Sequence, residues 1–217
     1  MTTIAVIDYG SGNLRSVAKA LQAVATAAET ILVTQNAAEA VQADRIVLPG
    51  VGAFADCWRG LNALPEMVPT ISRRVLEQGA PFLGICVGMQ LLAETGYEHE
   101  VSPGLGWLGG AVRALPRPDN GKIPHMGWNN VLLDKPASPL FRTIADATPF
   151  YFVHSYVMTP AQPAQRWAHC HYGQDFAAIV GQNNICGTQF HPEKSQTAGL
   201  HFLRNFLDWQ PDEGTPS

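Results

Sequence analysis

Cys86 is the residue of this sequence best placed to act as a nucleophile. It stands between Gly84 and Gly88, where a short apolar run gives way to an apolar pattern with helical spacing. Glycines two residues before and after a cysteine form the nucleophile-elbow pattern, with sulfur in place of the usual serine oxygen. The elbow would hold the sulfur near a helix N-terminus, where free N–H groups favour a thiolate and a neighbouring oxyanion. A lone cysteine is more often a buried structural residue, but the two glycines favour a reactive one here.

His191 and Glu193 could complete the chemistry that Cys86 begins. Pro192 lies between them and biases His191 toward an extended backbone. Residues two apart in an extended segment point to the same side, so Glu193 can hold one imidazole nitrogen while the other faces the thiol. Alone, such a pair would be ordinary surface residues. Together with the elbow, it predicts a triad of nucleophile, base and orienting carboxylate: Cys86, His191 and Glu193.

The turn Pro49-Gly50-Val51-Gly52 is a second candidate for the site. It follows the apolar run 46–48, and open α/β sheets place their ligands at the carboxyl ends of such strands. The glycines would let the backbone approach a ligand or change conformation, although a simple chain reversal would have the same composition. We expect this turn beside Cys86 on one sheet edge.

Other polar motifs give weaker signals. Gly10-Ser11-Gly12 lacks the third glycine of a dinucleotide site and the lysine of a P-loop. His154 alone is more often structural than catalytic. His169 and His171 share a face in an extended segment, but no further ligand lies near them in the sequence. We therefore expect no metal and no cofactor.

Alternating strands and helices must position these residues. Strands are expected at 4–8, 30–33 and 46–48, each followed by a helix, which favours a parallel sheet with helices on both faces. Asn36 resembles a helix N-cap, with Glu39 completing a capping box. A helix from Pro65 to Gln78, closed by Gly79, should lead to the strand at 82–85.

The pattern changes after the elbow. Shorter apolar pieces between 104 and 133, with a turn at 119–121, predict antiparallel strands or hairpins. Strands at 149–156 and 185–190 and a helix over 200–207 should follow. The predicted fold class is α/β: a mainly parallel open sheet with helices on both faces and an added antiparallel region. We expect a single domain at 1–210 and a frayed tail at 211–217.

Composition narrows the class of protein. The 217 residues are 46% hydrophobic and 15% charged, ordinary values for a globular chain. The net charge of −4 and the absence of a Lys/Arg cluster argue against nucleic acid as a partner. We expect no signal peptide and no membrane segment. Four cysteines without a CxxC motif suit the reducing cytoplasm, where a reactive thiol survives.

Taken together, the motifs resemble the class I, triad-type glutamine amidotransferases. The match is finest to the glutaminase subunits of imidazole glycerol phosphate synthase, which act in histidine biosynthesis. The residues that carry it, besides the elbow, are Asp8-Tyr9-Gly10-Ser11-Gly12-Asn13-Leu14, Pro49-Gly50-Val51-Gly52, Pro124-His125-Met126-Gly127-Trp128-Asn129, Phe152-Val153-His154-Ser155-Tyr156 and His191-Pro192-Glu193-Lys194-Ser195.

The resemblance implies hydrolysis of L-glutamine through a thioester on Cys86. The oxyanion would be held by backbone N–H groups of Val87 and of either Val51 or Gly52. Gly52 and Gln90 should line the glutamine pocket, and Ser155 and Tyr156 should meet the α-amino and α-carboxylate end. An acidic residue, Glu98 or Glu100, could pair with the ammonium; the spacing leaves both open.

The resemblance also implies a partner, because ammonia is protonated in water and must travel by a shielded path. In this family the path enters a (β/α)8-barrel cyclase, which we expect to be a separate chain forming a heterodimer. The residues matching family positions at that interface are Ser11, Asn13, Trp128, Tyr151 and Lys194. We hypothesise that the Val51 N–H is turned away until the partner and its ligand arrive.

Three other functions agree less well with the sequence. A stand-alone γ-glutamyl hydrolase or peptidase-like enzyme would lack the glutamine-pocket matches at Gln90, Ser155 and Tyr156. A glutaminase for pyridoxal phosphate or anthranilate synthesis is disfavoured by the 8–14 and 124–129 motifs. A non-catalytic subunit with a decayed site has no support, because all three triad residues are present.

Overall fold

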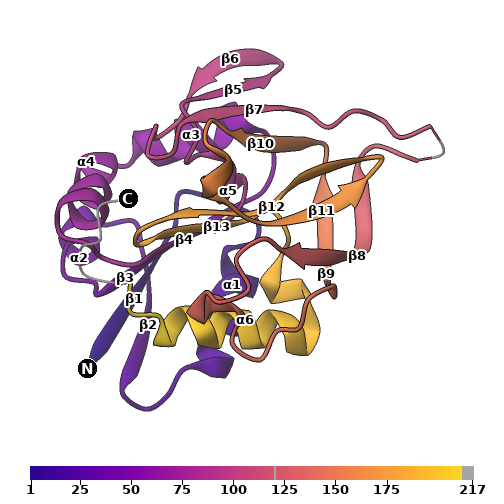
Figure 1. Cartoon of the computed structure of the whole chain (residues 1–217). Coiled ribbons are helices and arrows are strands. Elements are labelled where there is room, and N and C mark those ends of the chain that lie inside the picture. Colours follow the sequence, from indigo (N-terminus) through magenta and orange to yellow (C-terminus); the bar gives the residue numbers. More distant parts are fainter. Residues whose placement is uncertain (120, 212–217) are drawn as a thin grey trace.

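Two β-sheets and their covering helices make up the computed structural model, which describes residues 1–119 and 121–211 (Figure 1). Asn120 in the expected turn, and all of the expected tail beyond Pro211, lie outside these residues. The large sheet has nine strands in the order β2-β1-β3-β4-β13-β12-β11-β8-β9. The small sheet has four, in the order β10-β7-β5-β6.

The first five strands of the large sheet are mutually parallel. They are β2 (Glu29–Thr34), β1 (Thr2–Ile7), β3 (Arg45–Gly50), β4 (Phe82–Cys86) and β13 (Ile185–Thr188). Three of them, β3, β4 and β13, are buried along their whole length. Continuous apolar runs form such strands because helices cover both faces of a parallel sheet.

The other half of the large sheet is antiparallel. Its strands are β12 (Gln174–Gln182), β11 (Arg166–Tyr172), β8 (His125–Leu133) and β9 (Thr148–His154). The predicted α/β fold class with an added antiparallel region is confirmed. The antiparallel region contributes four of the nine strands of the large sheet.

Two predicted strands end earlier than expected. The strand expected at 149–156 stops at His154, and the chain then enters the small sheet at Tyr156. The strand expected at 185–190 stops at Thr188, although the Gln189 N–H still donates to the Ala178 carbonyl of β12 at 2.9 Å. Both breaks lie at residues that face the site described below.

The small sheet consists of three strands from the chain between β4 and β8 and one strand that follows β9. Its strands are β10 (Tyr156–Pro160), β7 (Gly110–Ala114), β5 (Thr95–Glu98) and β6 (Glu100–Pro103). Because β7 belongs to the small sheet and β8 to the large one, the segment 119–121 connects two sheets. The expected antiparallel strands are present, since β7 pairs antiparallel with β10 and β8 with β9, but β7 and β8 do not form a hairpin with each other.

Helices cover both faces of the large sheet. They are α1 (Leu14–Val24), α2 (Ala37–Ala40), α3 (Phe54–Ala63), α4 (Met67–Ser72) with a π-helical continuation (Arg73–Glu77), α5 (Val87–Gln90) and α6 (Gln196–Asp208). Three 3-10 turns lie at Pro139–Phe141, Pro163–Gln165 and Pro192–Lys194. Helices α1 and α6 pack together on one face, and α3, α4 and α5 lie on the other (Figure 1).

Asn36 is a helix N-cap, as predicted, but the capping box is absent. The Asn36 side chain accepts the Ala38 N–H at 2.9 Å. The Asn36 N–H donates to the Thr34 hydroxyl at 2.9 Å, and the Glu39 carboxylate accepts from that same hydroxyl. A capping box would have the Glu39 carboxylate accept the Asn36 N–H directly. Here the Thr34 hydroxyl lies between the two groups, so Glu39 contacts β2 through Thr34.

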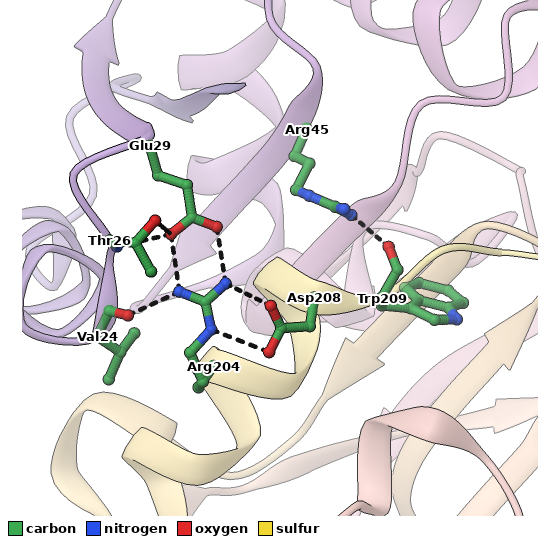
Figure 2. Close-up of polar contacts among 7 residues, drawn as sticks. All are labelled: Val24, Thr26, Glu29, Arg45, Arg204, Asp208 and Trp209. Atoms are coloured by element: carbon green, nitrogen blue, oxygen red, sulfur yellow. Dashed lines mark hydrogen bonds and ion pairs between the residues drawn. The ribbon is translucent and has the colours of Figure 1, made fainter. Parts of the chain in front are cut away.

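An ion-pair cluster ties α6 to the parallel edge of the sheet (Figure 2). The Arg204 guanidinium bridges both oxygens of Glu29 at 2.7 Å, the Val24 carbonyl at 2.7 Å and Asp208 at 2.8 Å. Hydrogen bonds from Arg204 lower the pKa of Glu29 to about 2, against the opposing effect of partial burial.

Candidate active site

Four loops that follow adjacent parallel strands converge at one edge of the large sheet. The loops after β1, β3, β4 and β13 carry Asn13, Val51, the Cys86 elbow and His191, in that order. This edge holds the carboxyl ends of the strands, where open α/β sheets bind their ligands. The turn at 49–52 lies beside Cys86, as predicted.

The backbone at Cys86 has the strained conformation of a nucleophile elbow. Its φ of 55° and ψ of −111° lie where side-chain-bearing residues are rare. A Cβ on Gly84 would stand 2.5 Å from the Gly88 carbonyl oxygen, and a Cβ on Gly88 would collide with the Leu48 carbonyl. The two glycines are therefore required for the elbow to pack against β3. Helix α5 covers only four residues, shorter than the expected helix, with Leu91 and Leu92 buried beyond it.

His191 and Glu193 form a buried pair beside Cys86. The His191 Nδ1–H donates to Glu193 Oε1 at 2.8 Å, and both side chains are 0% exposed. Among the described residues, His191 Nε2 is buried without a hydrogen-bond partner of its own. Burial alone would lower the pKa of His191, but the adjacent Cys86 sulfur and the Glu193 carboxylate raise it well above its usual value. The three predicted triad residues thus lie together, and these neighbours favour the protonated form of the His191 imidazole.

Ser11 and Asn13, two of the residues expected at the partner interface, are buried and hydrogen-bonded within the chain. The Ser11 hydroxyl donates to Asn13 Oδ1 at 2.8 Å. Asn13 Nδ2 donates to Glu193 Oε1 at 3.2 Å, the same oxygen that receives the His191 proton. Asn13 therefore supports the triad carboxylate directly.

Side chains hold the turn at 49–52 in one conformation. The Val51 N–H donates to the Ser11 hydroxyl at 3.1 Å. The Tyr9 hydroxyl donates to the Pro49 carbonyl at 2.6 Å, and the Cys57 thiol donates to the Val51 carbonyl at 3.4 Å. Gly52 has a φ of +102°, which glycine adopts without strain. In this conformation the Val51 N–H is directed at Ser11.

A cleft of about 500 Å³ opens over the sulfur. Among its lining residues are those expected to hold substrate or oxyanion: Val51, Gly52, Val87, Gln90, Ser155 and Tyr156. Lys194, exposed at the surface, also borders it. This volume is within the usual range for small-molecule sites.

Of the two glutamates left open by the sequence, Glu98 lines the cleft. Its carboxylate accepts the Phe54 N–H at the start of α3, at 2.7 Å. Glu100 instead pairs with Arg59 at 2.6 Å, farther along the same helix, where both side chains are exposed. The structure thus places one acidic group at the cleft.

Buried polar side chains that the sequence did not single out surround Gln90. The Gln90 Nε2 group donates to the Tyr156 carbonyl and to Gln189 Oε1, each at 3.0 Å. The Tyr156 carbonyl also accepts from His154 Nδ1 at 3.0 Å, and burial lowers the pKa of His154 to about 3. His154 is therefore neutral and structural, as expected. Gln189 could have been found from its position, two residues before His191 in an extended segment.

The β8–β9 hairpin presents an aromatic pair beside the site. Trp128 is 48% exposed and meets Tyr151 edge-on, with ring centroids 6.1 Å apart. The Tyr151 carbonyl accepts the His191 N–H at 2.9 Å, and its N–H donates to Ser195. This surface thus adjoins the backbone of the triad segment.

Within 1–119 and 121–211, no three His, Cys, Asp or Glu side chains are grouped to hold a metal ion. His169 bonds to Asp134 at 2.9 Å, and His171 bonds to Asp175 at 2.8 Å. No helix among these residues has the length and hydropathy needed to cross a lipid bilayer.

Comparisons with known proteins agree with this fold. The family model for class-I glutamine amidotransferases covers residues 5–209. A crystal structure titled glutamine amidotransferase superposes with a TM-score of 0.71 at 18% identity, covering 94% of this chain and 97% of that one. The PurLQS structure from Thermotoga maritima gives a TM-score of 0.71 at 20% identity, covering 95% and 98%. The chain belongs to the class I glutamine amidotransferase family.

Closer relatives narrow the family. Imidazole glycerol phosphate synthase subunit HisH of Zymomonas mobilis is 54% identical over 211 residues, which cover 97% of each chain. The HisH subunit of Rhodospirillum rubrum is 52% identical over 212 residues, covering 96% of this chain and 99% of its own. Within the family, the chain is a HisH-type subunit.

Proposed function

We propose that this chain hydrolyses L-glutamine and delivers the ammonia to a cyclase subunit of imidazole glycerol phosphate synthase. The observation that carries the proposal is the buried pair of His191 and Glu193 beside Cys86, in a chain with HisH relatives of about half-identical sequence. The cleft above Cys86 has room for one amino acid.

The chemistry follows from the three side chains. The Cys86 thiolate attacks the side-chain carbonyl carbon of glutamine, and the His191 imidazolium gives its proton to the leaving nitrogen. Ammonia departs and a γ-glutamyl thioester remains on Cys86. His191, now neutral, takes a proton from water as it attacks the thioester, and glutamate leaves. Glu193 keeps the Nδ1 proton in place throughout, so that Nε2 performs both transfers.

The oxyanion of each tetrahedral intermediate needs backbone donors. The Val87 N–H, at the start of α5, is one, and the 49–52 turn supplies the other. We infer that the conformation in which the Val51 N–H donates to Ser11 is the resting one. Docking of the partner and its ligand would rotate the peptide toward the cleft, which the neighbouring Gly52 permits.

Substrate contacts follow from the polar groups at the cleft. Both hydrogens of the Gln90 amide are used within the chain, which leaves Gln90 Oε1 as the atom available to the substrate amide. Glu98 suits the α-ammonium group, and Ser155 and Tyr156 suit the α-carboxylate end, partly through backbone. Gly52 lines the same wall.

The ammonia must reach its acceptor without being protonated. The acceptor is a phosphoribulosyl-formimino-aminoimidazole-carboxamide ribotide in the (β/α)8 barrel of the cyclase, and the products are imidazole glycerol phosphate and aminoimidazole carboxamide ribotide. Trp128, Tyr151 and Lys194 supply the docking surface around the cleft. Ser11 and Asn13 act from beneath it. We place the heterodimer in the cytoplasm, where reducing conditions preserve the Cys86 thiol.

Co-purification with the cyclase, followed by a glutaminase assay with and without the cyclase ligand, tests this function. We expect ammonia release to be slow for the isolated chain and to rise sharply in the liganded complex. Cys86→Ala should abolish release while leaving the complex intact. Full turnover by the isolated chain would instead indicate a stand-alone glutamine hydrolase.

A further inference from the structure

Gln189 is a buried side chain that contacts the reacting sulfur and has no part in the mechanism above. Its exposed fraction is 0%, and its Nε2 atom lies 3.7 Å from Cys86 Sγ. The position follows from strand register. Thr188 of β13 is paired with Ile85 of β4, so the next residues, Gln189 and Cys86, lie side by side where both strands end.

The amide of Gln189 can point only one way. A backbone carbonyl accepts hydrogen bonds and never donates them, so the Gln90 atom 3.0 Å from the Tyr156 carbonyl must be nitrogen. The same Gln90 nitrogen lies 3.0 Å from Gln189, whose facing atom must therefore be oxygen. The remaining NH2 group of Gln189 is thus directed at the Cys86 sulfur. The hydrogen-bond network, rather than the shape of the amide, fixes this assignment.

We propose that Gln189 is a further catalytic residue, whose side-chain N–H donates to the Cys86 thiolate and favours the ionised sulfur. A hydrogen bond to the charged form of a group stabilises that form, and it does so more strongly where water is excluded. Cys86 is only 4% exposed, so few water molecules can take the place of this donor. The inference rests on the proposed function, because it assumes that Cys86 acts as a thiolate nucleophile.

The network also connects the nucleophile to the substrate pocket. Gln90 borders the cleft and donates to Gln189, which in turn donates to Cys86. A side chain that only filled space at this position would have no such directed contacts. Replacement of Gln189 by an apolar side chain of equal length distinguishes a hydrogen-bond donor to Cys86 from a side chain that only fills space.

Gln189→Met provides that replacement, because it preserves length and removes the donor. The measurement is the alkylation rate of Cys86 by iodoacetamide between about pH 5 and 9, followed on the Cys86 peptide by mass spectrometry. We expect alkylation at about pH 6 to be about tenfold slower, with the midpoint of the pH profile about one unit higher. Thr188→Val is the matched control: it removes a buried hydrogen bond to the Phe190 carbonyl in the same segment, and its profile should equal that of the unmodified protein.

Gln189→Glu is the second variant, and it decides the question if the methionine variant does not fold. It keeps an oxygen for Gln90 but sets a carboxylate against the thiolate, so the midpoint should rise at least as far. The other titratable groups that act on Cys86 or border its cleft are unchanged in every variant: His191, Tyr9, Cys57, Glu98, His154, Tyr156 and Lys194. Unshifted profiles in folded Gln189 variants would overturn the proposal. Alkylation needs neither glutamine nor cyclase, so a failure of glutaminase activity would count against the proposed function alone.

Discussion

Asn13 donates its side-chain N–H to Glu193 over 3.2 Å, although 180 residues separate the two in the chain. Asn13 follows β1 and Glu193 follows β13, two strands that lie on either side of the β3–β4 pair. The shared carboxylate oxygen also receives the Nδ1–H of His191. The orientation of the catalytic imidazole therefore depends on a loop at the opposite end of the sequence.

Asn13→Ala should slow glutamine hydrolysis without changing the fold. A hydrogen bond to a charged group contributes about 1.5–3 kcal/mol, so we expect kcat to fall at least about tenfold in the liganded complex. Asn13→Asp should lower kcat further, because it places a second carboxylate against that of Glu193. Steady-state glutaminase kinetics measure the effect. Asn36→Ala removes an asparagine side-chain hydrogen bond at the start of α2, which makes no contact with the triad, and should leave kcat unchanged.

Ser11→Ala should raise the glutaminase activity of the isolated chain. The substitution removes the acceptor of the Val51 N–H, so the resting conformation of the 49–52 turn loses one hydrogen bond. It also removes the hydrogen bond to Asn13, but Asn13 acts on Glu193 with and without the cyclase, so the ratio of the two activities isolates the effect on the turn. A loss of about 1 kcal/mol corresponds to about a fivefold higher basal rate and a smaller stimulation by the cyclase. Assays with and without the cyclase provide both values. An unchanged ratio would show that this bond does not restrain the turn.

The sequence was sufficient to predict that Cys86, His191 and Glu193 lie together, because each half of the proposed triad is a local pattern. The glycines around Cys86 and the proline between His191 and Glu193 act within a few residues of the group they position. Asn13 and Gln189 could not be assigned in this way, because their contacts depend on which strands are neighbours. The order β1-β3-β4-β13 brings them to the site, and that order is set by crossovers along the whole chain.

Strand ends were predicted less well for a related reason. The expected strands included Ser155-Tyr156 and Gln189-Phe190, but pairing in the two ladders stops at His154 and at Thr188, which the local sequence does not mark. The choice between Glu98 and Glu100 also required the structure. The β5–β6 hairpin runs along α3, so residues two apart reach opposite parts of that helix, one at the cleft and one at the surface.

Glu98→Gln should weaken glutamine binding more than it slows catalysis. The variant keeps an oxygen to accept the Phe54 N–H, so α3 remains capped, but it loses the charge that pairs with the substrate ammonium. We expect KM for glutamine to rise at least about tenfold with kcat little changed. Glu100→Gln is the control, because its pairing with Arg59 is exposed and it should leave KM unaltered. Equal effects of the two substitutions would count against this role for Glu98.

Glu29 should make the fold sensitive to acid. Its pKa is lowered from the ordinary 4.5 to about 2, chiefly by hydrogen bonds from Arg204 (Figure 2). Because the folded state holds the carboxylate ionised, the stabilisation is complete above about pH 4.5 and declines as the pH falls toward 2. Glu29→Gln should therefore reduce the free energy of unfolding by about 2 kcal/mol at neutral pH, and by progressively less below pH 4.5. Urea denaturation of both proteins across this range measures the difference.

Asp208→Asn, at a carboxylate that is 51% exposed, should have a much smaller effect at neutral pH. A Glu29→Gln deficit that stayed constant from neutral pH down to the acid limit would mean that packing, and not the charge on Glu29, joins α6 to β2.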